Sequence, residues 1–411
     1  MSLASYISSV VSAVNSRNGK RLKELFRLDS DAALVAMQVA QRGGNVPAGE
    51  INRQLPAPWN DIVLSYLQAL VHVTKGERLQ ACKEFRERHC RGLLDCLSED
   101  VWMLPAVVGM ATTLKNLAAQ ADVEALRKGA NVNTTQLSAC CQLLQMAFSR
   151  TGAAKGQHAE AKRAAAVGIG NVMLAIYFRL NTLTNCKQIT TQIDRNAADM
   201  LDAAVASERV TYRYYTGRLK AYDEDFSGAD EDLSYAFAQC HPAAYGNRRR
   251  ILTYLVPIKM LLGVLPSDDL LQKYKLTEYM DVAKAVRTGD VGLLMRTLDA
   301  NQAVLVQAGT YLLLEKMQLA AYRRLFKKCA LVHAEAQPGK ATQVPLALMQ
   351  RALELQGLPK DDAELQCLVA NLIYRKYIRG YVAYKARVVV LAKTDAFPPL
   401  SAVALADPFS A

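Results

Sequence analysis

Residues 361–391 read DDAELQCLVANLIYRKYIRGYVAYKARVVVL, and this stretch decides the fold class of the C-terminal region. Apolar residues at helical spacing predict a helix over 361–374. Two short strand-like runs follow, over 380–382 and 388–391, with a basic turn between them, and they predict a β-hairpin. A helix that leads into a small hairpin is typical of a winged helix, a module that grips nucleic acid or stacks against another subunit.

Upstream of this segment the chain reads as a series of amphipathic helices with short breaks, and strand-like alternation is nearly absent. One further helix of the winged-helix module is expected at about 345–355. Residues 214–237 place small side chains at Gly217, Ala229 and Ala236 among aromatic ones, which is typical of a tetratricopeptide-like helical hairpin. Such hairpins stack into a solenoid, and an irregular helical bundle is the alternative.

The fold class predicted from these patterns is mainly α, with a tetratricopeptide-like helical-repeat solenoid capped by a C-terminal winged-helix subdomain. We expect N-terminal helical repeats over 1–205 and a second helical-repeat part over 206–343. The winged helix is expected over 344–400, followed by a tail over 401–411. A very apolar helix is expected to begin near Asn247, and Pro257 within it predicts a kink or a boundary.

The composition favours an ordered, basic protein. Hydrophobic residues make up 51% of the 411 positions, and 50 Lys and Arg residues exceed 38 Asp and Glu residues to give a net charge of +12. This excess favours a polyanionic or acidic partner, although a basic protein with a solvated surface is an equally open reading. The nine cysteines are scattered and odd in number, which indicates a reducing, cytosolic or nuclear compartment. We expect no secretory signal and no membrane contact.

Basic residues gather where a winged helix would meet nucleic acid. Four of them, Arg323, Arg324, Lys327 and Lys328, lie within six positions of one predicted helix, so members four apart share a face. Others flank the last helix and line the hairpin, with tyrosines between them at 374, 377, 381 and 384: Arg375, Lys376, Arg379, Lys385 and Arg387. These residues predict a surface that follows phosphates and binds less tightly as salt rises.

The alternative reading of the same residues is a solvated basic face, with the tyrosines packing the hairpin onto the core. Sequence-specific reading of bases is not expected, because few Asn or Gln residues accompany the charges. A second basic run, Arg248, Arg249 and Arg250, predicts contact with an acidic partner or with nucleic acid. Here the alternative is a helix start with exposed arginines.

No motif predicts catalysis, a cofactor or a small-molecule substrate. Gly168-Ile169-Gly170 has no preceding strand and no third glycine, so it is not a dinucleotide fingerprint. Pro338-Gly339-Lys340 lacks the upstream glycine and following Ser or Thr of a phosphate-binding loop. Cysteine and histidine gather only at Cys82, His89, Cys90 and Cys96, without a Cys-x-x-Cys pair, and buried thiols are favoured over zinc ligands.

Several stretches together resemble one family, the PCI-domain subunits of the transcription-and-export complex 2 (TREX-2). They are residues 214–218 with 225–226, 249–263, 322–328, 366–374 with 379–381, and 397–400. The resemblance implies a nuclear scaffold subunit, near the nuclear pore, that supports export of messenger RNA. It also implies three kinds of partner: a large PCI scaffold subunit, a small acidic disordered subunit shared with the proteasome lid, and RNA, with DNA possible as well.

The main alternative is an assembly subunit of the COP9-signalosome or proteasome-lid kind. A close paralogue of the TREX-2 subunit associates with the signalosome, and the winged helix of such a subunit serves assembly without touching nucleic acid. Both alternatives are non-enzymatic. They differ in whether the basic residues of the C-terminal region bind a polyanion.

Overall fold

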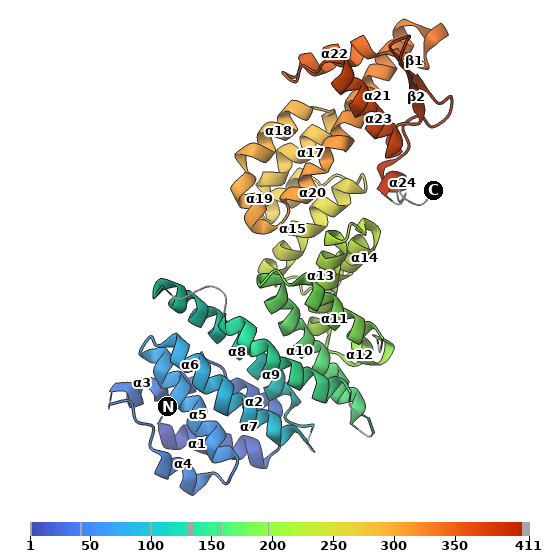
Figure 1. Ribbon diagram of the computed structural model, residues 1–411. Helices are drawn as coiled ribbons and strands as arrows, with labels where there is room; N and C mark the ends of the chain where they lie inside the picture. The colour runs from blue at the N-terminus through green and yellow to red at the C-terminus, as the bar shows by residue number, and fades with distance from the viewer. Residues whose placement is uncertain are drawn as a thin grey trace. The chain divides into compact units, whose positions relative to one another are not determined.

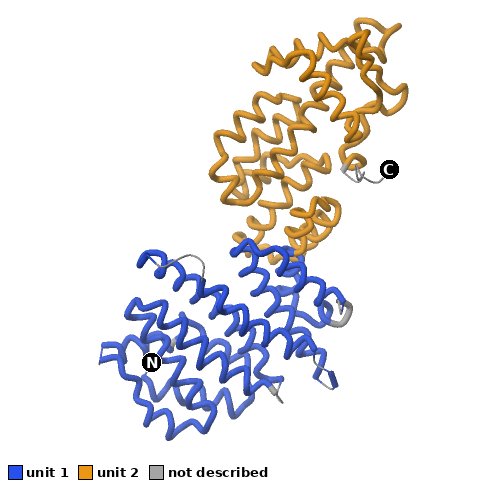
Figure 2. Tube along the Cα trace, viewed as in Figure 1, with its two compact units in different colours: residues 1–215 blue, residues 216–411 orange. Residues whose placement is uncertain are grey.

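The computed structural model describes residues 2–41, 43–98, 101–129, 135–153, 155–156, 158–195 and 197–404. The chain divides into two compact units, residues 1–215 and 216–411 (Figure 2). The architecture is mainly helical, with one small sheet near the C-terminus (Figure 1), so the predicted fold class is confirmed. The predicted domain boundaries after residues 205, 343 and 400 stay predictions, and the tail lies outside the described residues from 405 on. Among the described residues, no helix is both long and apolar enough to cross a membrane.

Unit 1 is built from helices that pack against one another. In chain order they are α1 Leu3–Asn15, α2 Gly19–Leu25, α3 Asp31–Gln41, α4 Ala48–Gln54, α5 Trp59–Thr74, α6 Arg78–Glu84, α7 Arg91–Asp95, α8 Leu104–Arg127, α9 Gln136–Gly152, α10 Ala159–Arg179, α11 Leu183–Asp194 and α12 Ala197–Ala203. Helix α10 is central, because every residue from 165 to 174 is buried. A Cβ atom at Gly168 would lie 2.9 Å from Val108, and one at Gly170 would lie 3.0 Å from Ile193. The Gly-x-Gly pattern therefore serves close helix packing.

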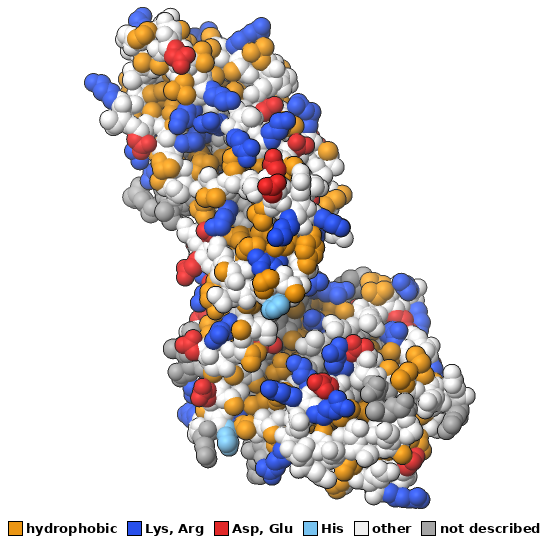
Figure 3. All heavy atoms as spheres, turned by 180° about the vertical axis from the view of Figure 1, so that it is seen from behind, with side chains coloured by type: hydrophobic (Ala, Val, Ile, Leu, Met, Phe, Trp, Pro, Cys, Tyr) orange, Lys and Arg blue, Asp and Glu red, His pale blue; other side chains and the backbone are white. Residues whose placement is uncertain are grey.

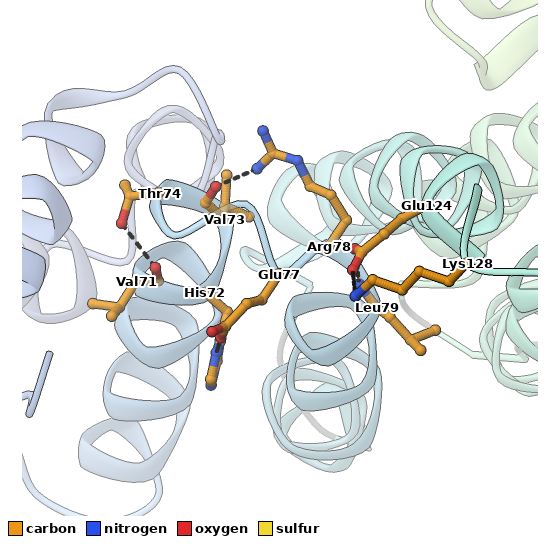
Figure 4. A network of polar contacts seen from close by, with 9 residues as sticks. All are labelled: Val71, His72, Val73, Thr74, Glu77, Arg78, Leu79, Glu124 and Lys128. Carbon is orange, nitrogen blue, oxygen red and sulfur yellow. Dashed lines mark hydrogen bonds and ion pairs between the residues drawn. The ribbon is translucent and has the colours of Figure 1, made fainter. Parts of the chain in front are cut away.

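A polar network joins the turn between α5 and α6 to helix α8 (Figure 4). The carboxylate of Glu124 accepts a hydrogen bond from the backbone N–H of Leu79 at 2.9 Å and pairs with Lys128. The Lys128 ammonium, followed by the Leu79 N–H, holds the pKa of Glu124 below its ordinary value. Since the first N–H groups of a helix have no partner within the helix, Glu124 stabilises the start of α6 from outside it.

Unit 2 begins in the last turns of α13 (Ala206–Tyr222) and continues through α14 Phe226–Gln239, α15 Tyr245–Leu261, α16 Asp268–Lys273, α17 Met280–Thr288, α18 Val291–Ala300, α19 Gln302–Ala308, α20 Tyr311–Glu315 and α21 Met317–Ala336. Helices α13 and α14, with the turn between them, form the predicted helical hairpin. Gly217 faces Leu233 so closely that a Cβ atom there would lie 2.7 Å from the Leu233 Cγ. The Asp225 side chain caps α14 by accepting from the N–H of Gly228 at 2.9 Å, as expected for an N-cap aspartate.

Helix α15 runs through Pro257 to Leu261, so of the two predicted alternatives, a kink or a boundary, the boundary does not occur. Proline has no N–H group, and it leaves the carbonyl oxygen four residues earlier without its helical donor. In this protein that oxygen belongs to Thr253, and it accepts a hydrogen bond from the buried hydroxyl of Tyr279 at 2.9 Å instead. A tertiary contact therefore replaces the missing helical hydrogen bond.

The C-terminal part is a winged helix. It comprises α22 Leu346–Glu354, α23 Asp362–Tyr374 and a three-stranded antiparallel sheet in the order β1-β3-β2, with β1 Gln343–Pro345, β2 Gly380–Ala383 and β3 Val388–Leu391. Asp361 and Glu364 form a reciprocal capping box at the start of α23. The predicted helices and hairpin are confirmed. Strand β1 was missed, because three residues are too few to show an alternating pattern.

A short segment after the sheet returns to the helices of unit 2. Helix α24 (Leu400–Ala404) packs on α15, with Leu400 beside Gly263. Pro398 and Val403 are buried in this return segment. Residues 397–404, which we call the return segment, therefore tie the winged helix to the helical part of the same unit.

Candidate nucleic-acid interface

Helix α21 carries the four predicted basic residues, but it does not present them alike. Arg324 and Lys328 are exposed, Lys327 is half-buried, and Arg323 is buried. Arg323 and Lys327 are four residues apart, yet only Lys327 retains access to solvent. The difference arises because α21 is covered on one side by the return segment and by α22.

The guanidinium of Arg323 holds the return segment. Its Nη2 donates to the carbonyl oxygen of Phe397 at 2.9 Å and also to that of Pro398. Burial lowers the pKa of Arg323 below its ordinary value, and the neighbouring Arg324 charge acts in the same direction. Both hydrogen-bond acceptors are neutral, so the charge of Arg323 is stabilised by carbonyl dipoles. Contact between Arg323 and nucleic acid stays a prediction that this arrangement does not favour, and we leave Arg323 out of the surface proposed below.

The basic residues of the winged helix fall into a paired and an unpaired group. Arg379 forms an ion pair with Asp395 at 2.8 Å, and Arg387 forms one with Asp362 at 2.7 Å. Lys376 and Lys385 are exposed and form no ion pair with any residue that the structure describes. Among the described residues, the side chain of Arg375 donates only to the neutral Asn371 amide oxygen, at 3.2 Å. Three of the five predicted cations of the winged helix therefore retain an uncompensated charge.

Three of the four tyrosines named from the sequence are free for contact. Tyr374, Tyr381 and Tyr384 are 60%, 61% and 74% exposed. Tyr377 instead lies partly in the core, where burial raises its pKa against the lowering effect of Arg375 and Arg323. Exposed aromatic rings beside unpaired cations are the combination that binds single-stranded nucleic acid through stacking and charge.

The other basic run, at the start of α15, is mostly used inside the unit. The Arg248 guanidinium lies 4.2 Å from the ring centroid of Phe237, a cation–π contact. Arg249 donates to the carbonyl oxygens of Tyr274 and Lys275, both at 3.0 Å, which follow the end of α16. Arg250 is exposed, and no described residue forms an ion pair with it. Of the three arginines, Arg250 is the exposed one, and contact of this run with a partner stays a prediction.

Charge pairing varies among the lysines of unit 2 between α13 and α21. Lys273, Lys275 and Lys284 form no ion pair with a described residue. Three other lysines have acidic partners: Lys220 pairs with Asp232 at 2.9 Å, Lys259 with Asp230 at 2.7 Å and Lys316 with Glu224 at 2.8 Å. Arg324, Lys327 and Lys328 have none among the described residues. Lys and Arg side chains outnumber Asp and Glu over the face of unit 2 that Figure 3 shows. Uncompensated like charges repel one another until an anion binds.

The cysteine and histidine concentration in unit 1 is part of the core. Cys82, His89 and Cys90 are buried, and no group of metal-binding side chains was found among the described residues. The Nδ1 atom of His89 lies 3.0 Å from the carbonyl oxygen of Ile62, and its ring packs against Phe26, Tyr66 and Phe85. Burial lowers the pKa of His89 to about 4. His89 is therefore neutral near pH 7.

A helical-repeat array that ends in a winged helix defines a PCI-domain protein, and comparison with known proteins agrees. A PCI domain model matches residues 297–393, and a model of PSMD3-like, N-terminal TPR repeats matches residues 150–281. The chain belongs to the PCI domain-containing protein 2 family: it is 30% identical to the Danio rerio member over 409 residues, covering 98% of this chain and 99% of the relative. Proteins of this family are generally non-catalytic scaffolds, and a PCI domain implies assembly with other PCI proteins.

Two further relatives show how far the similarity extends. The Drosophila melanogaster homologue is 32% identical over 409 residues, covering 96% of this chain and 98% of the relative. The Arabidopsis thaliana protein called Enhanced ethylene response protein 5 is 36% identical over 303 residues, covering 74% of this chain and 72% of that protein. The similarity therefore includes the winged helix and the helical repeats together.

Proposed function

We propose that this chain is a scaffold and nucleic-acid-binding subunit of a nuclear, transcription-coupled mRNA-export complex of the TREX-2 type. It works without catalysis or cofactor, near the nuclear pore, on RNA and also on DNA. Its protein partners are a larger PCI scaffold subunit and the small acidic disordered subunit shared with the proteasome lid. Family membership supports the PCI assembly, and the charge arrangement of unit 2 supports the binding of nucleic acid.

The observation that carries the proposal is a set of exposed or half-buried cations that have no acidic partner among the described residues. We call these residues the unpaired basic surface: Arg324, Lys327, Lys328, Arg375, Lys376 and Lys385. Phosphate groups are the anions that such a surface attracts when aromatic rings stand beside it. Arg379 and Arg387 add less, since Asp395 and Asp362 already neutralise them.

Protein partners would use other surfaces of the chain. The exposed Arg250 supports contact with an acidic segment, because arginine forms strong charge-assisted hydrogen bonds with carboxylates. Arg248 and Arg249 would support that contact indirectly, by holding the start of α15 against Phe237 and the end of α16.

Charge reversal on α21 tests the binding of nucleic acid. In the full-length chain, Arg324→Glu, Lys327→Glu and Lys328→Glu together should weaken binding of a labelled single-stranded RNA. If each residue contacts one phosphate, the slope of log K against log salt should fall by about 2. A matched control reverses three exposed cations of unit 1, Lys83, Arg91 and Arg127, with the same change in net charge.

The two variants give distinct outcomes. A loss of affinity confined to the α21 variant supports a local surface, and equal losses in both indicate only a general effect of net charge. Unchanged affinity and salt slope in the α21 variant would reject nucleic-acid binding and leave the pure assembly subunit. Co-purification from nuclear extract then separates the two assemblies, by recovering either the export scaffold or the signalosome.

A further inference from the structure

Helix α17 presents two cations that the sequence patterns did not single out. Its buried face consists of Val282, Ala283, Ala285 and Val286. Lys284 and Arg287 lie on the opposite, exposed face, three residues apart. Among the described residues neither has an ion-pair partner. They share this property with the unpaired basic surface of α21 and the wing.

The C-terminal end of α17 contacts α21 beside its basic residues. The Nε atom of Arg324 donates to the carbonyl oxygen of Arg287 at 3.2 Å. Gly289 follows α17 with φ of 74°, and a Cβ atom there would lie 2.8 Å from the backbone nitrogen of Leu325. The last turn of α17 therefore lies directly against the segment of α21 that carries Arg324.

The winged helix also contacts the turn between α17 and α18. Gln356, in the loop between α22 and α23, accepts a hydrogen bond from the N–H of Val291 at 2.8 Å and donates one to the carbonyl oxygen of Gly289 at 3.0 Å. A single side chain thus satisfies backbone groups at the end of α17 and at the start of α18. The turn between these helices is fixed to both α21 and the winged helix, which gives Lys284 and Arg287 a defined place.

We propose that Lys284 and Arg287 extend the unpaired basic surface, so that the phosphate backbone of a nucleic acid continues from α21 onto α17. This inference rests on the proposed function and adds a path for the bound strand, which crosses from α21 onto α17. No ion pair joins either cation to Asp290, whose carboxylate caps α18 by accepting from the N–H of Leu293 at 2.8 Å. Asp281 lies one turn before Lys284, and no ion pair joins the two.

A structural role for the same residues makes a different prediction. A cation in the last turn of a helix interacts favourably with the helix dipole, and Arg287 occupies the last turn of α17. If that were its entire role, removing it would lower stability and leave the affinity for RNA unchanged. Lys284 lies earlier in the helix, where this effect has faded.

The test uses the full-length chain and a fluorescein-labelled single-stranded RNA of mixed sequence. Lys284→Ala combined with Arg287→Ala should weaken binding about 25-fold at 0.1 M salt and lower the salt slope by about 1.4, if each residue contacts one phosphate of a single strand. The control is Lys83→Ala combined with Arg91→Ala in unit 1. A second variant, Lys284→Gln with Arg287→Gln, keeps the side chains long and should show the same loss.

The outcomes separate this inference from the function on which it rests. If the α21 charge-reversal variant loses affinity and both α17 variants bind as the unsubstituted chain does, α17 is off the path of the strand and the inference is wrong. If neither the α21 nor the α17 variants lose affinity, nucleic-acid binding by this surface is itself refuted. A loss in the alanine variant that the glutamine variant does not reproduce would assign the effect to altered packing, which also overturns the inference.

Discussion

Replacing Arg323 with alanine should weaken the attachment of the return segment to α21. The substitution leaves the carbonyl oxygens of Phe397 and Pro398 without their donor, one of them fully buried. An unsatisfied buried polar group costs about 1–3 kcal/mol. Alanine also relieves the burial of a charge, which the lowered pKa of Arg323 reflects. Taking both effects together, we expect a loss of about 3 kcal/mol in the free energy of unfolding.

For a unit the size of residues 216–411, that loss corresponds to a fall of about 6–12 °C in the melting temperature of unit 2. Scanning calorimetry measures it, and limited proteolysis should show earlier cleavage within 397–404. Arg324→Ala is the matched control, because Arg324 is the next residue of the same helix and is exposed. It should change the melting temperature little and weaken RNA binding.

Arg323→Ala, assayed well below its transition, should bind RNA nearly as the unsubstituted chain does. The reasoning is refuted if the melting temperature of Arg323→Ala stays within about 1 °C of the unsubstituted chain, since breaking one buried and one partly buried hydrogen bond should cost far more. It is refuted as well if Arg323→Ala loses more RNA affinity than Arg324→Ala while remaining folded. That second result would return Arg323 to the binding surface.

Two other changes test the packing of each unit. Gly217→Ala places a Cβ atom 2.7 Å from the Leu233 Cγ and should cost about 1–3 kcal/mol of unfolding free energy through overpacking, measured by urea titration. The control is Gly246→Ala in α15, where a Cβ atom meets nothing within 4 Å, and it should be neutral or slightly stabilising. In unit 1, burial lowers the pKa of His89 to about 4, whereas a histidine in the unfolded chain has a pKa of about 6.5. As pH falls below about 6.5, the unfolded chain therefore takes up the proton before the folded one does, and the folded state loses stability. Between pH 7.5 and 5 this should remove about 2 kcal/mol, and His89→Phe should lose that share of the acid sensitivity; an equal loss in both proteins would contradict a neutral buried His89.

The fold was accessible from the sequence wherever a local pattern was long enough. Apolar periodicity placed α23 to within one residue, because thirteen residues of helix with a capping box leave little ambiguity. It missed β1, and it left open whether Pro257 kinks α15 or ends it. A strand of three residues carries no measurable period, and the partner that lets α15 continue through Pro257 is the hydroxyl of Tyr279, 22 residues later in the chain.

The candidate site was harder to predict, because charge alone does not say which cations are available. The i, i+4 spacing grouped Arg323 with Lys327 in one predicted surface, but the return segment buries Arg323 and leaves Lys327 half-buried. The ion pair of Arg387 with Asp362 spans 25 positions of sequence, and no local pattern announces it. Lys284 and Arg287 were overlooked for the same reason: only the packing of α17 on α21 brings the last turn of α17, with Arg287, beside Arg324.

The return segment has a consequence for where this domain ends as a physical object. The PCI family model stops at residue 393, just after the last strand. The folded unit continues at least to Val403, because Pro398 and Val403 are buried. The carbonyl groups of Phe397 and Pro398 also accept hydrogen bonds from Arg323. A chain cut at 393 would keep α22, α23 and the three strands, yet it would lose both carbonyl acceptors of Arg323 and the packing of α24 on α15. The end of the family model and the end of the folded unit thus differ by helix α24 and the proline-rich link before it.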